Sequence, residues 1–245
     1  RILSDGSEME YTQKFGLHKI YHNLILGREI GALIEDGNLV PELVFSENGI
    51  NRQDLSFDNQ TQEFKPSNNR SEKMCVVTNY EKFSKGKKTI IFTASTKENL
   101  SLLSDFQEKG YENMRIFDSV NKEESGARAE VLKWYKNTPD AILINTGVFT
   151  TGFDEPTIES VITALATASL SKFKQMVGRG GRSTKLIFKD KFIHIDLGGN
   201  ITKFGKWSDP VDWSELFYLE TKAVPKKEAL DNVSNCSECD CLIPA

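Results

Sequence analysis

The sequence predicts an α/β domain, a parallel sheet flanked by crossover helices, over residues 71–200. From Ser71 onward, short apolar runs rich in β-formers alternate with amphipathic helical patterns. Strands and helices that alternate at this spacing pair in parallel through right-handed crossovers. This alternation has limits on both sides, because residues 46–70 are mostly polar and Gly198-Gly199-Asn200 ends the alternation of strands and helices. The core is therefore expected between these two boundaries.

The expected elements follow from local periodicity and caps. Before the domain, Ile30, Leu33 and Ile34 indicate a helix over Arg28–Asp36 that stops at Gly37. Further helices are expected over Ser71–Ser84, from a cap at Ser95 or Thr96 to Gly110, over Glu123–Asn137 and over Ser169–Val177. Strands are expected over Thr89–Phe92, Met114–Phe117, Ala141–Ile144, Ser160–Leu165 and Phe192–Leu197. Residues 201–233 form an aromatic extension, expected to pack back on the domain through Trp207, Trp213, Phe217 and Tyr218.

Composition indicates an ordinary soluble globular protein, with 38% hydrophobic and 27% charged residues among 245. No apolar run has the length of a membrane span, no signal peptide opens the chain, and Arg1 in place of Met suggests a start internal to a longer protein. Four cysteines, three of them close to the end, do not indicate a disulfide framework, so we expect a cytoplasmic protein.

Charge is informative through its distribution. The net charge of −4 argues against a protein that binds nucleic acid over its whole surface. Lys172–Lys191, however, carries seven basic residues and one acid, Asp190. Contacts with phosphate should therefore be local to that stretch.

The most informative motif is Gln-Met-Val-Gly-Arg-Gly-Gly-Arg at residues 175–182. Arg179 and Arg182 each supply five donors in a fixed fork and stay charged at working pH. Glycines between them let a backbone approach closely or adopt a positive φ. The motif indicates a phosphate-gripping site, and the alternative is a basic, glycine-rich surface turn.

A second motif follows a buried strand at residues 142–156. Thr146 ends the strand, and Gly152, Asp154 and Pro156 come after a short turn-forming segment. Ligands of open parallel sheets gather at the carboxyl ends of strands, so these groups suit a nucleotide or a nucleic-acid backbone. The alternative is that Asp154 only caps the following turn.

The two motifs resemble motifs VI and V of superfamily 2 helicases and translocases, and Lys87–Ser95 resembles motif IV of that family. Their order on a parallel-sheet pattern makes residues 71–200 similar to the second RecA-like lobe of a superfamily 2 motor. Tyr21–Pro41 resembles the stretch after the first lobe in DEAD/DEAH-type DNA helicases of phage and repair character, so residues 1–70 are expected to be an inter-lobe segment.

The resemblance implies roles for individual residues. Arg179 and Arg182 would contact the γ-phosphate of ATP, with Arg182 as the arginine finger, and Gln175 would couple the nucleotide to the opposite lobe. Gly152 and Asp154 would lie near the nucleotide. Nucleic-acid contacts would come from Thr146 and Ser95, with Lys172 and Lys174 as further candidates that could equally be solvated. Ser95 could hold a phosphate at a helix N-terminus.

The chain lacks half of such an active site. No Gly-x4-Gly-Lys-Ser/Thr and no Asp-Glu-x-Asp/His occur in it, so ATP and Mg²⁺ would be held mainly by a first lobe of the same parent chain. The chain alone is therefore expected to be inactive. The expected partners are that lobe and nucleic acid, DNA above all, and no membrane. The alternatives are a non-catalytic binding module with a helicase-lobe fold and the motor part of a restriction enzyme.

The final residues 234–245 contain Cys236, Cys239 and Cys241. Cys-x2-Cys is a spacing typical of zinc knuckles, and the third cysteine adds a possible ligand. The segment resembles the first half of a zinc ribbon, which predicts Zn²⁺ in the parent protein. The alternative is a solvent-exposed tail.

Overall fold

The computed structural model describes residues 17–46, 55–58, 63–66, 70–117, 125–146, 154–183, 189–218, 233–235 and 242–244. Its centre is a six-stranded sheet of order β1-β9-β7-β4-β6-β5, in which every neighbouring pair is parallel. The strands are β1 (Glu42–Phe45), β4 (Thr89–Thr93), β5 (Met114–Phe117), β6 (Ile142–Asn145), β7 (Ser160–Ala164) and β9 (Phe192–Asp196). The predicted α/β class, a parallel sheet flanked by helices, is confirmed.

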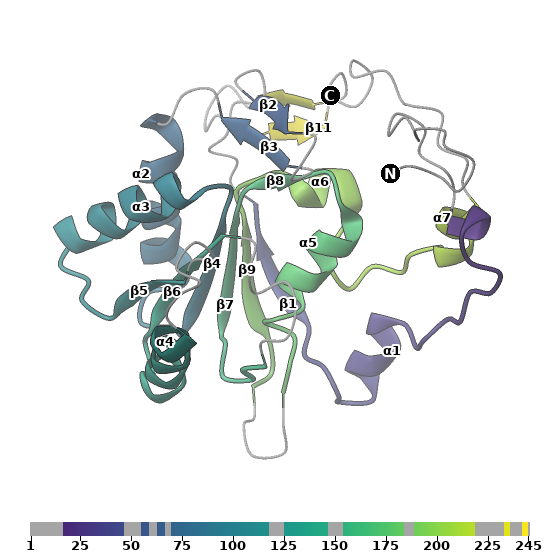
Figure 1. Cartoon of the computed structure of the whole chain (residues 1–245), viewed down its shortest axis with the longest axis horizontal. Coiled ribbons are helices and arrows are strands. Elements are labelled where there is room, and N and C mark those ends of the chain that lie inside the picture. The colour runs from purple at the N-terminus through teal and green to yellow at the C-terminus, as the bar shows by residue number, and fades with distance from the viewer. Residues whose placement is uncertain are drawn as a thin grey trace.

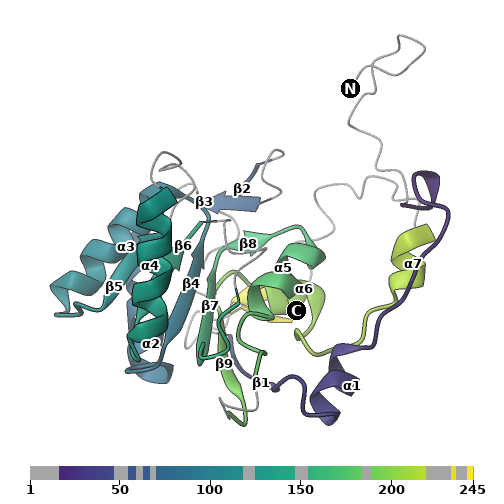
Figure 2. The same ribbon diagram turned by 60° about the horizontal axis from the view of Figure 1, so that its bottom comes forward.

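Helices cover both faces of the sheet (Figures 1 and 2). The central strands are apolar on both sides, since Ile91 packs into one cluster while Ile90 and Phe92 pack into the other. The first cluster lies under α2 (Arg70–Phe83) and α3 (Thr96–Glu108). The second lies under α4 (Ser125–Asn137) and α5 (Leu170–Val177), with α6 (Asn200–Phe204) and α1 (Ile30–Glu35) at its margin.

The helix bounds predicted from capping residues and terminal glycines agree closely with those of the structure. Ser95 caps α3, and Ser169 caps α5, each by accepting a hydrogen bond from a backbone N–H three residues on. Gly37 and Gly110 end their helices with φ of 73° and 84°, the left-handed conformation that glycine adopts without strain. The start expected at Glu123 for α4 falls outside the described residues.

The sheet extends beyond the expected core, because β1 lies in the segment assigned before it. Its residues pair with β9, with Val44 opposite His194. The strand is only Glu42–Phe45, at the edge of the sheet and directly after Pro41, so its sequence carries no periodic signal. In the expected connection, β2 (Leu55–Asp58) and β3 (Glu63–Pro66) form an antiparallel pair that continues onto β8 (Ala166–Thr167).

The aromatic extension packs back in part. Trp207 and Phe217 are buried, whereas Trp213 and Tyr218 are 37% and 63% exposed. Phe217 belongs to α7 (Trp213–Tyr218), which packs on the short 3-10 helix η1 (Leu17–Lys19) at one side of the molecule (Figure 1). At the end of the chain, β10 (Val233–Asn235) pairs with β11 (Leu242–Pro244). None of the helices in the described ranges has the length and apolar character of a membrane span.

Candidate functional site

The site begins with α5, whose apolar face is built into the sheet. Phe173, Met176 and Val177 recur at helical spacing and are fully buried in the core. The helix ends at Val177, and its last turn leads into residues 178–182, which we call the arginine loop. Burial of this face fixes the direction in which the loop leaves the helix.

The glycines of the arginine loop serve close packing against aromatic rings. A Cβ at Gly180 would lie 2.1 Å from the Phe192 ring, and one at Gly181 would lie 2.3 Å from the Trp207 ring. Neither glycine, nor Gly178, is among those with positive φ. Of the two reasons expected for these glycines, close approach therefore holds and the left-handed conformation does not.

The two arginines occupy different environments. Arg179 is 5% exposed, and burial lowers the pKa of its guanidinium, with the charge of Arg182 acting in the same direction. Arg182 has a side chain 35% exposed, and its Nη1 donates to Asp154 Oδ1 at 2.6 Å. The structure thus joins residues from the two motifs, which are 28 positions apart in sequence. Arg182 is the guanidinium that a ligand can reach.

Lys189 holds the arginine loop from the side. Its Nζ donates to the carbonyl oxygens of Gly180 and Ile158, each at 2.6 Å. Burial lowers the pKa of Lys189 to about 8. The backbone of Val40 adds a further bond, from its N–H to the Gly181 carbonyl at 2.8 Å. The sequence showed Lys189 only as one of several basic residues, so its contacts could not be predicted.

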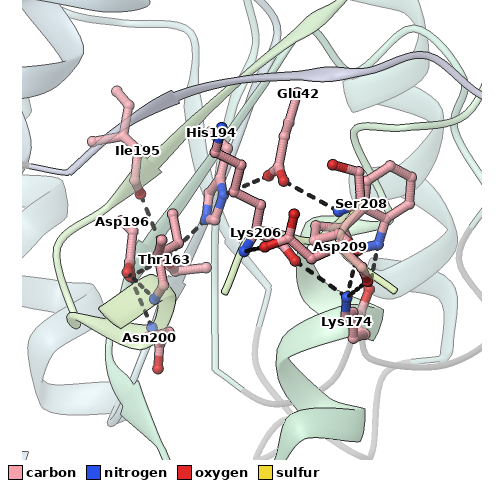
Figure 3. Close-up of polar contacts among 12 residues, drawn as sticks. Glu42, Thr163, Lys174, His194, Ile195, Asp196, Asn200, Lys206, Ser208 and Asp209 are labelled. Atoms are coloured by element: carbon pink, nitrogen blue, oxygen red, sulfur yellow. Dashed lines mark hydrogen bonds and ion pairs between the residues drawn. The ribbon is translucent and has the colours of Figure 1, made fainter. Parts of the chain in front are cut away.

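Lys174 is not a surface lysine. It is 8% exposed, and its Nζ donates to the carbonyls of Lys206, Trp207 and Asp209 at 3.1, 2.6 and 2.9 Å (Figure 3). This corrects both expectations for it, a nucleic-acid contact and a solvated side chain, because the ammonium is directed into the protein. Lys172 is half-buried. Gln175 is exposed, and its Nε2 donates to Ser171 Oγ at 3.3 Å.

A second polar group lies at the carboxyl edge of the sheet. Thr146 follows β6, and its hydroxyl lies 2.9 Å from that of Thr93 at the end of β4. Asn99 Nδ2 donates to Thr146 Oγ1 at 2.8 Å. These bonds fix the Thr146 hydroxyl at the edge where ligands of parallel sheets gather.

Ser95 does not offer the phosphate site expected at the start of α3. Its hydroxyl donates to Glu98 Oε1 at 2.9 Å, while the other carboxylate oxygen accepts from the Ala94 N–H at 3.1 Å. Ser95 Oγ also accepts from the Glu98 N–H at 3.3 Å, so the two side chains cap the start of the helix in a variant of the capping box. A carboxylate at this point would repel phosphate, so the geometry speaks against that role and supports Ser95 as a cap.

Some predicted site residues lie outside the described residues: Gly152, Cys236, Cys239 and Cys241. Within the part of the chain that the structure describes, no group of three or more His, Cys, Asp or Glu side chains is arranged to hold a metal ion. The described residues thus contain no candidate metal centre.

A buried polar network behind the site was not predicted (Figure 3). Glu42 and His194, 1% and 0% exposed, pair at 3.0 Å through Oε2 and Nδ1. His194 Nε2 lies 3.3 Å from the hydroxyl of Thr163, which donates to Asp196 Oδ1 at 2.9 Å. Asn200 Nδ2 donates to the same oxygen, also at 2.9 Å. The network joins β1, β9, β7 and α6, elements too distant in sequence for any local pattern to connect.

Comparison with known proteins gives a consistent picture. Residues 68–184 match the model of the helicase conserved C-terminal domain. A 51.5 kDa protein of a Lactococcus phage (isolate 7-9) is 25% identical over 232 residues, which cover 94% of this chain and 50% of that protein. A Saccharomyces cerevisiae protein assigned by its name to the ATP-dependent helicases, IRC3, is 30% identical over 146 residues, 56% of this chain and 20% of that protein.

The fold is also similar to a solved structure from Vibrio vulnificus YJ016, a fragment assigned as the HsdR subunit of a type I restriction enzyme. The TM-score is 0.59 at 23% identity, over 79% of this chain and 39% of that one. This likeness concerns the fold alone. The chain spans about half the length of the phage relative and about a fifth of the yeast relative.

Proposed function

We propose that this chain, whose residues 68–184 belong to the helicase conserved C-terminal domain family, is the second motor lobe of a longer ATP-dependent helicase or translocase. Its substrate would be nucleic acid, DNA above all. The observation that carries the proposal is the pairing of Asp154 with Arg182 beside the buried Arg179. The two guanidinium groups outweigh the charge of the one carboxylate, so this partly exposed position is suited to phosphate.

The chemistry proposed for Arg182 is electrostatic. In ATP hydrolysis, water attacks the γ-phosphorus, the bond to the β–γ bridging oxygen breaks, and the products are ADP, phosphate and a proton. Charge on the transferred group and the leaving oxygen is stabilised by a guanidinium held in position, an effect of about 10³–10⁵ in rate in related systems. Asp154 holds Arg182 through their ion pair, and Arg179 adds positive charge nearby.

The same chain is not proposed to hydrolyse ATP alone. Its sequence contains no phosphate-binding Gly-x4-Gly-Lys-Ser/Thr loop, and the nearest imitation, over residues 178–185, has the wrong spacing and order. The β- and γ-phosphates and Mg²⁺ would be held by a first RecA-like lobe elsewhere in the parent protein. Gln175, exposed at the end of α5, would then couple the nucleotide to that lobe.

Nucleic acid would contact the carboxyl edge of the sheet through Thr146, whose hydroxyl Thr93 and Asn99 hold in place. Lys172, half-buried in the first turn of α5, remains a candidate for a phosphate contact. For the cysteines of residues 236–241, the proposal is a structural Zn²⁺ site completed by ligands outside this chain, which elemental analysis of the parent protein would detect.

The decisive experiment measures ATP hydrolysis by the parent protein, with and without single-stranded and duplex DNA. Arg182→Ala and Arg179→Ala should each remove DNA-stimulated hydrolysis while ATP still binds. Arg115→Ala is the control, because Arg115 lies in β5, at the edge of the sheet opposite β1 and β9, where the arginine loop packs. Equal activity of the two loop variants and the control would favour a binding module with a helicase-lobe fold. A parent that cleaves DNA during translocation would instead indicate the motor of a restriction enzyme.

A further inference from the structure

The turn at residues 205–209, which follows α6, is joined to α5 in both directions (Figure 3). Lys174 Nζ donates to three carbonyls of this turn, those of Lys206, Trp207 and Asp209. In return, Trp207 Nε1 donates to the Lys174 carbonyl at 3.0 Å. A buried ammonium is costly to desolvate, and here each of its three N–H groups finds an acceptor. Helix α5 and the 205–209 turn are therefore each held by hydrogen bonds that the other donates.

The same tryptophan also packs directly against the backbone of the arginine loop. Trp207 is 3% exposed, and its ring occupies the space that a side chain at Gly181 would need. It meets Phe192 edge to face, with ring centroids 5.7 Å apart, and Phe192 occupies the corresponding space beside Gly180. The rings of Trp207 and Phe192 thus pack against the loop backbone between and beside the two arginines.

The turn at residues 205–209 is also hydrogen-bonded to the sheet. The Ser208 N–H donates to Glu42 Oε1 at 3.3 Å, and the other oxygen of Glu42 pairs with His194. Glu42 and Trp207 both lie outside residues 68–184, the part that matches the helicase C-terminal domain. The support of the arginine loop therefore comes from segments on both sides of that domain.

We infer that Lys174 and Trp207 are positioning residues for Arg179 and Arg182, and that the 205–209 turn sets where the two guanidinium groups lie. The inference rests on the proposed function. Arginines stabilise developing phosphate charge well only when they are held in place before the reaction. Misplacement by about 1 Å through a remote change can cost about 10²-fold in rate. Neither residue touches the nucleotide in this mechanism, because both act through the loop.

The test uses Trp207→Phe and Lys174→Met, with Trp213→Phe as the control. Trp207→Phe keeps an aromatic ring on the loop but removes the hydrogen bond to Lys174, so it remains informative if Lys174→Met does not fold. Trp213 is the same residue type, lies in α7 and is 37% exposed. In the chain itself, amide hydrogen exchange at residues 178–182 should be about tenfold faster or more in Trp207→Phe and Lys174→Met, and unchanged in Trp213→Phe.

The second readout is kinetic and uses the parent protein. We expect kcat for ATP to fall by about 10–100-fold in Trp207→Phe, with KM and the affinity for ADP within about threefold of wild type. Binding of ADP with aluminium fluoride, which imitates the transferred phosphoryl group, should weaken in parallel with kcat. Both quantities should be unchanged in Trp213→Phe. A merely structural role would lower the unfolding temperature without this separation of kcat from KM.

The outcomes separate the two proposals. Unchanged exchange at residues 178–182, or wild-type kcat in a variant with faster exchange, overturns the positioning role and leaves the proposed function standing. An inactive wild-type parent, or an Arg182→Ala variant that hydrolyses ATP normally, overturns the proposed function, and the positioning role with it.

Discussion

Gly180→Ala is the substitution that most directly tests how the arginine loop is packed. Gly180 lies between the two arginines, and because its φ is not positive, its backbone would accept alanine if the space were open. A Cβ placed there, however, would lie 2.1, 2.5 and 2.7 Å from three atoms of the Phe192 ring. Ordinary carbon contacts begin at about 3.5 Å, so the ring or the loop must move by roughly 1.4 Å.

The cost follows from what surrounds the ring. Phe192 is fully buried, and Trp207 packs against it, so neither neighbour can move into solvent. Overpacking of a core by one methyl group costs about 1–3 kcal/mol, and the closeness of the contact places this substitution near the upper value. For a chain of this size, a loss of about 3 kcal/mol lowers the unfolding temperature by about 6–12 °C.

The assay is thermal unfolding followed by circular dichroism, with Gly31→Ala as the matched control. Gly31 lies in the first turn of α1 and has no neighbouring atom within 4 Å of the new Cβ, so alanine there should stabilise by about 0.4–1 kcal/mol. In a double-mutant cycle, Gly180→Ala should cost less in a Phe192→Ala background than in wild type, because Phe192→Ala removes all three clashing atoms, Cγ, Cδ2 and Cε2. An unfolding temperature for Gly180→Ala within 1 °C of wild type would refute the account of these glycines.

Three further predictions concern charged groups. The pKa of Lys189 is lowered to about 8 from 10.5, so between these pH values the unfolded chain binds more protons than the folded chain. The free energy of unfolding of wild type, relative to Lys189→Met, should therefore rise as the pH is raised from about 8 to 10. Urea titrations at several pH values that show no change in this difference would contradict the prediction. Glu42→Ala leaves the buried His194 ring and the half-buried Ser208 N–H without their acceptor, and it should lower the free energy of unfolding by about 2–5 kcal/mol. A loss below about 1 kcal/mol in urea would show that water replaces the carboxylate. Lys172→Ala should reduce the slope of log Kd for DNA against log salt by about one in the parent protein, and an unchanged slope would remove Lys172 from the interface.

The sheet was predictable where its signals are local, and the edge strand was not. The helix from Thr96 carries a cap, an apolar stripe and a terminal glycine within a few residues, so its bounds can be read from sequence. Glu42–Phe45 is four residues long, and its partner Phe192–Asp196 lies about 150 positions away. Nothing near β1 indicates that partner, because strand pairing in a parallel sheet is non-local.

The difference between local signals and non-local contacts also determines which site residues could be predicted. The arginine motif and Asp154 were predicted because their residue types and order carry the chemistry. Lys174 and Lys172 look alike in sequence, two positions apart on one helix, yet Lys174 is buried against the carbonyls of the 205–209 turn and Lys172 is half-buried. The difference arises from a segment about 30 residues away that the basic pattern does not contain. Burial, and not residue type, therefore decides which lysine is structural.

The exposure of the Asp154–Arg182 pair also bears on how the site would work. Such a pair, with side chains 76% and 35% exposed, holds a geometry but contributes only about 0–1 kcal/mol, because water and salt screen it. A phosphate in a closed cleft offers the same guanidinium a stronger, charge-assisted partner in lower dielectric. Arg182 can therefore exchange Asp154 for phosphate at little cost. Arg179, which is 5% exposed and packed against the protein, has no comparable freedom. In the proposed function, the loop backbone fixes where both arginines begin, and Arg182 exchanges its exposed ion pair for phosphate while Arg179 stays packed against the protein.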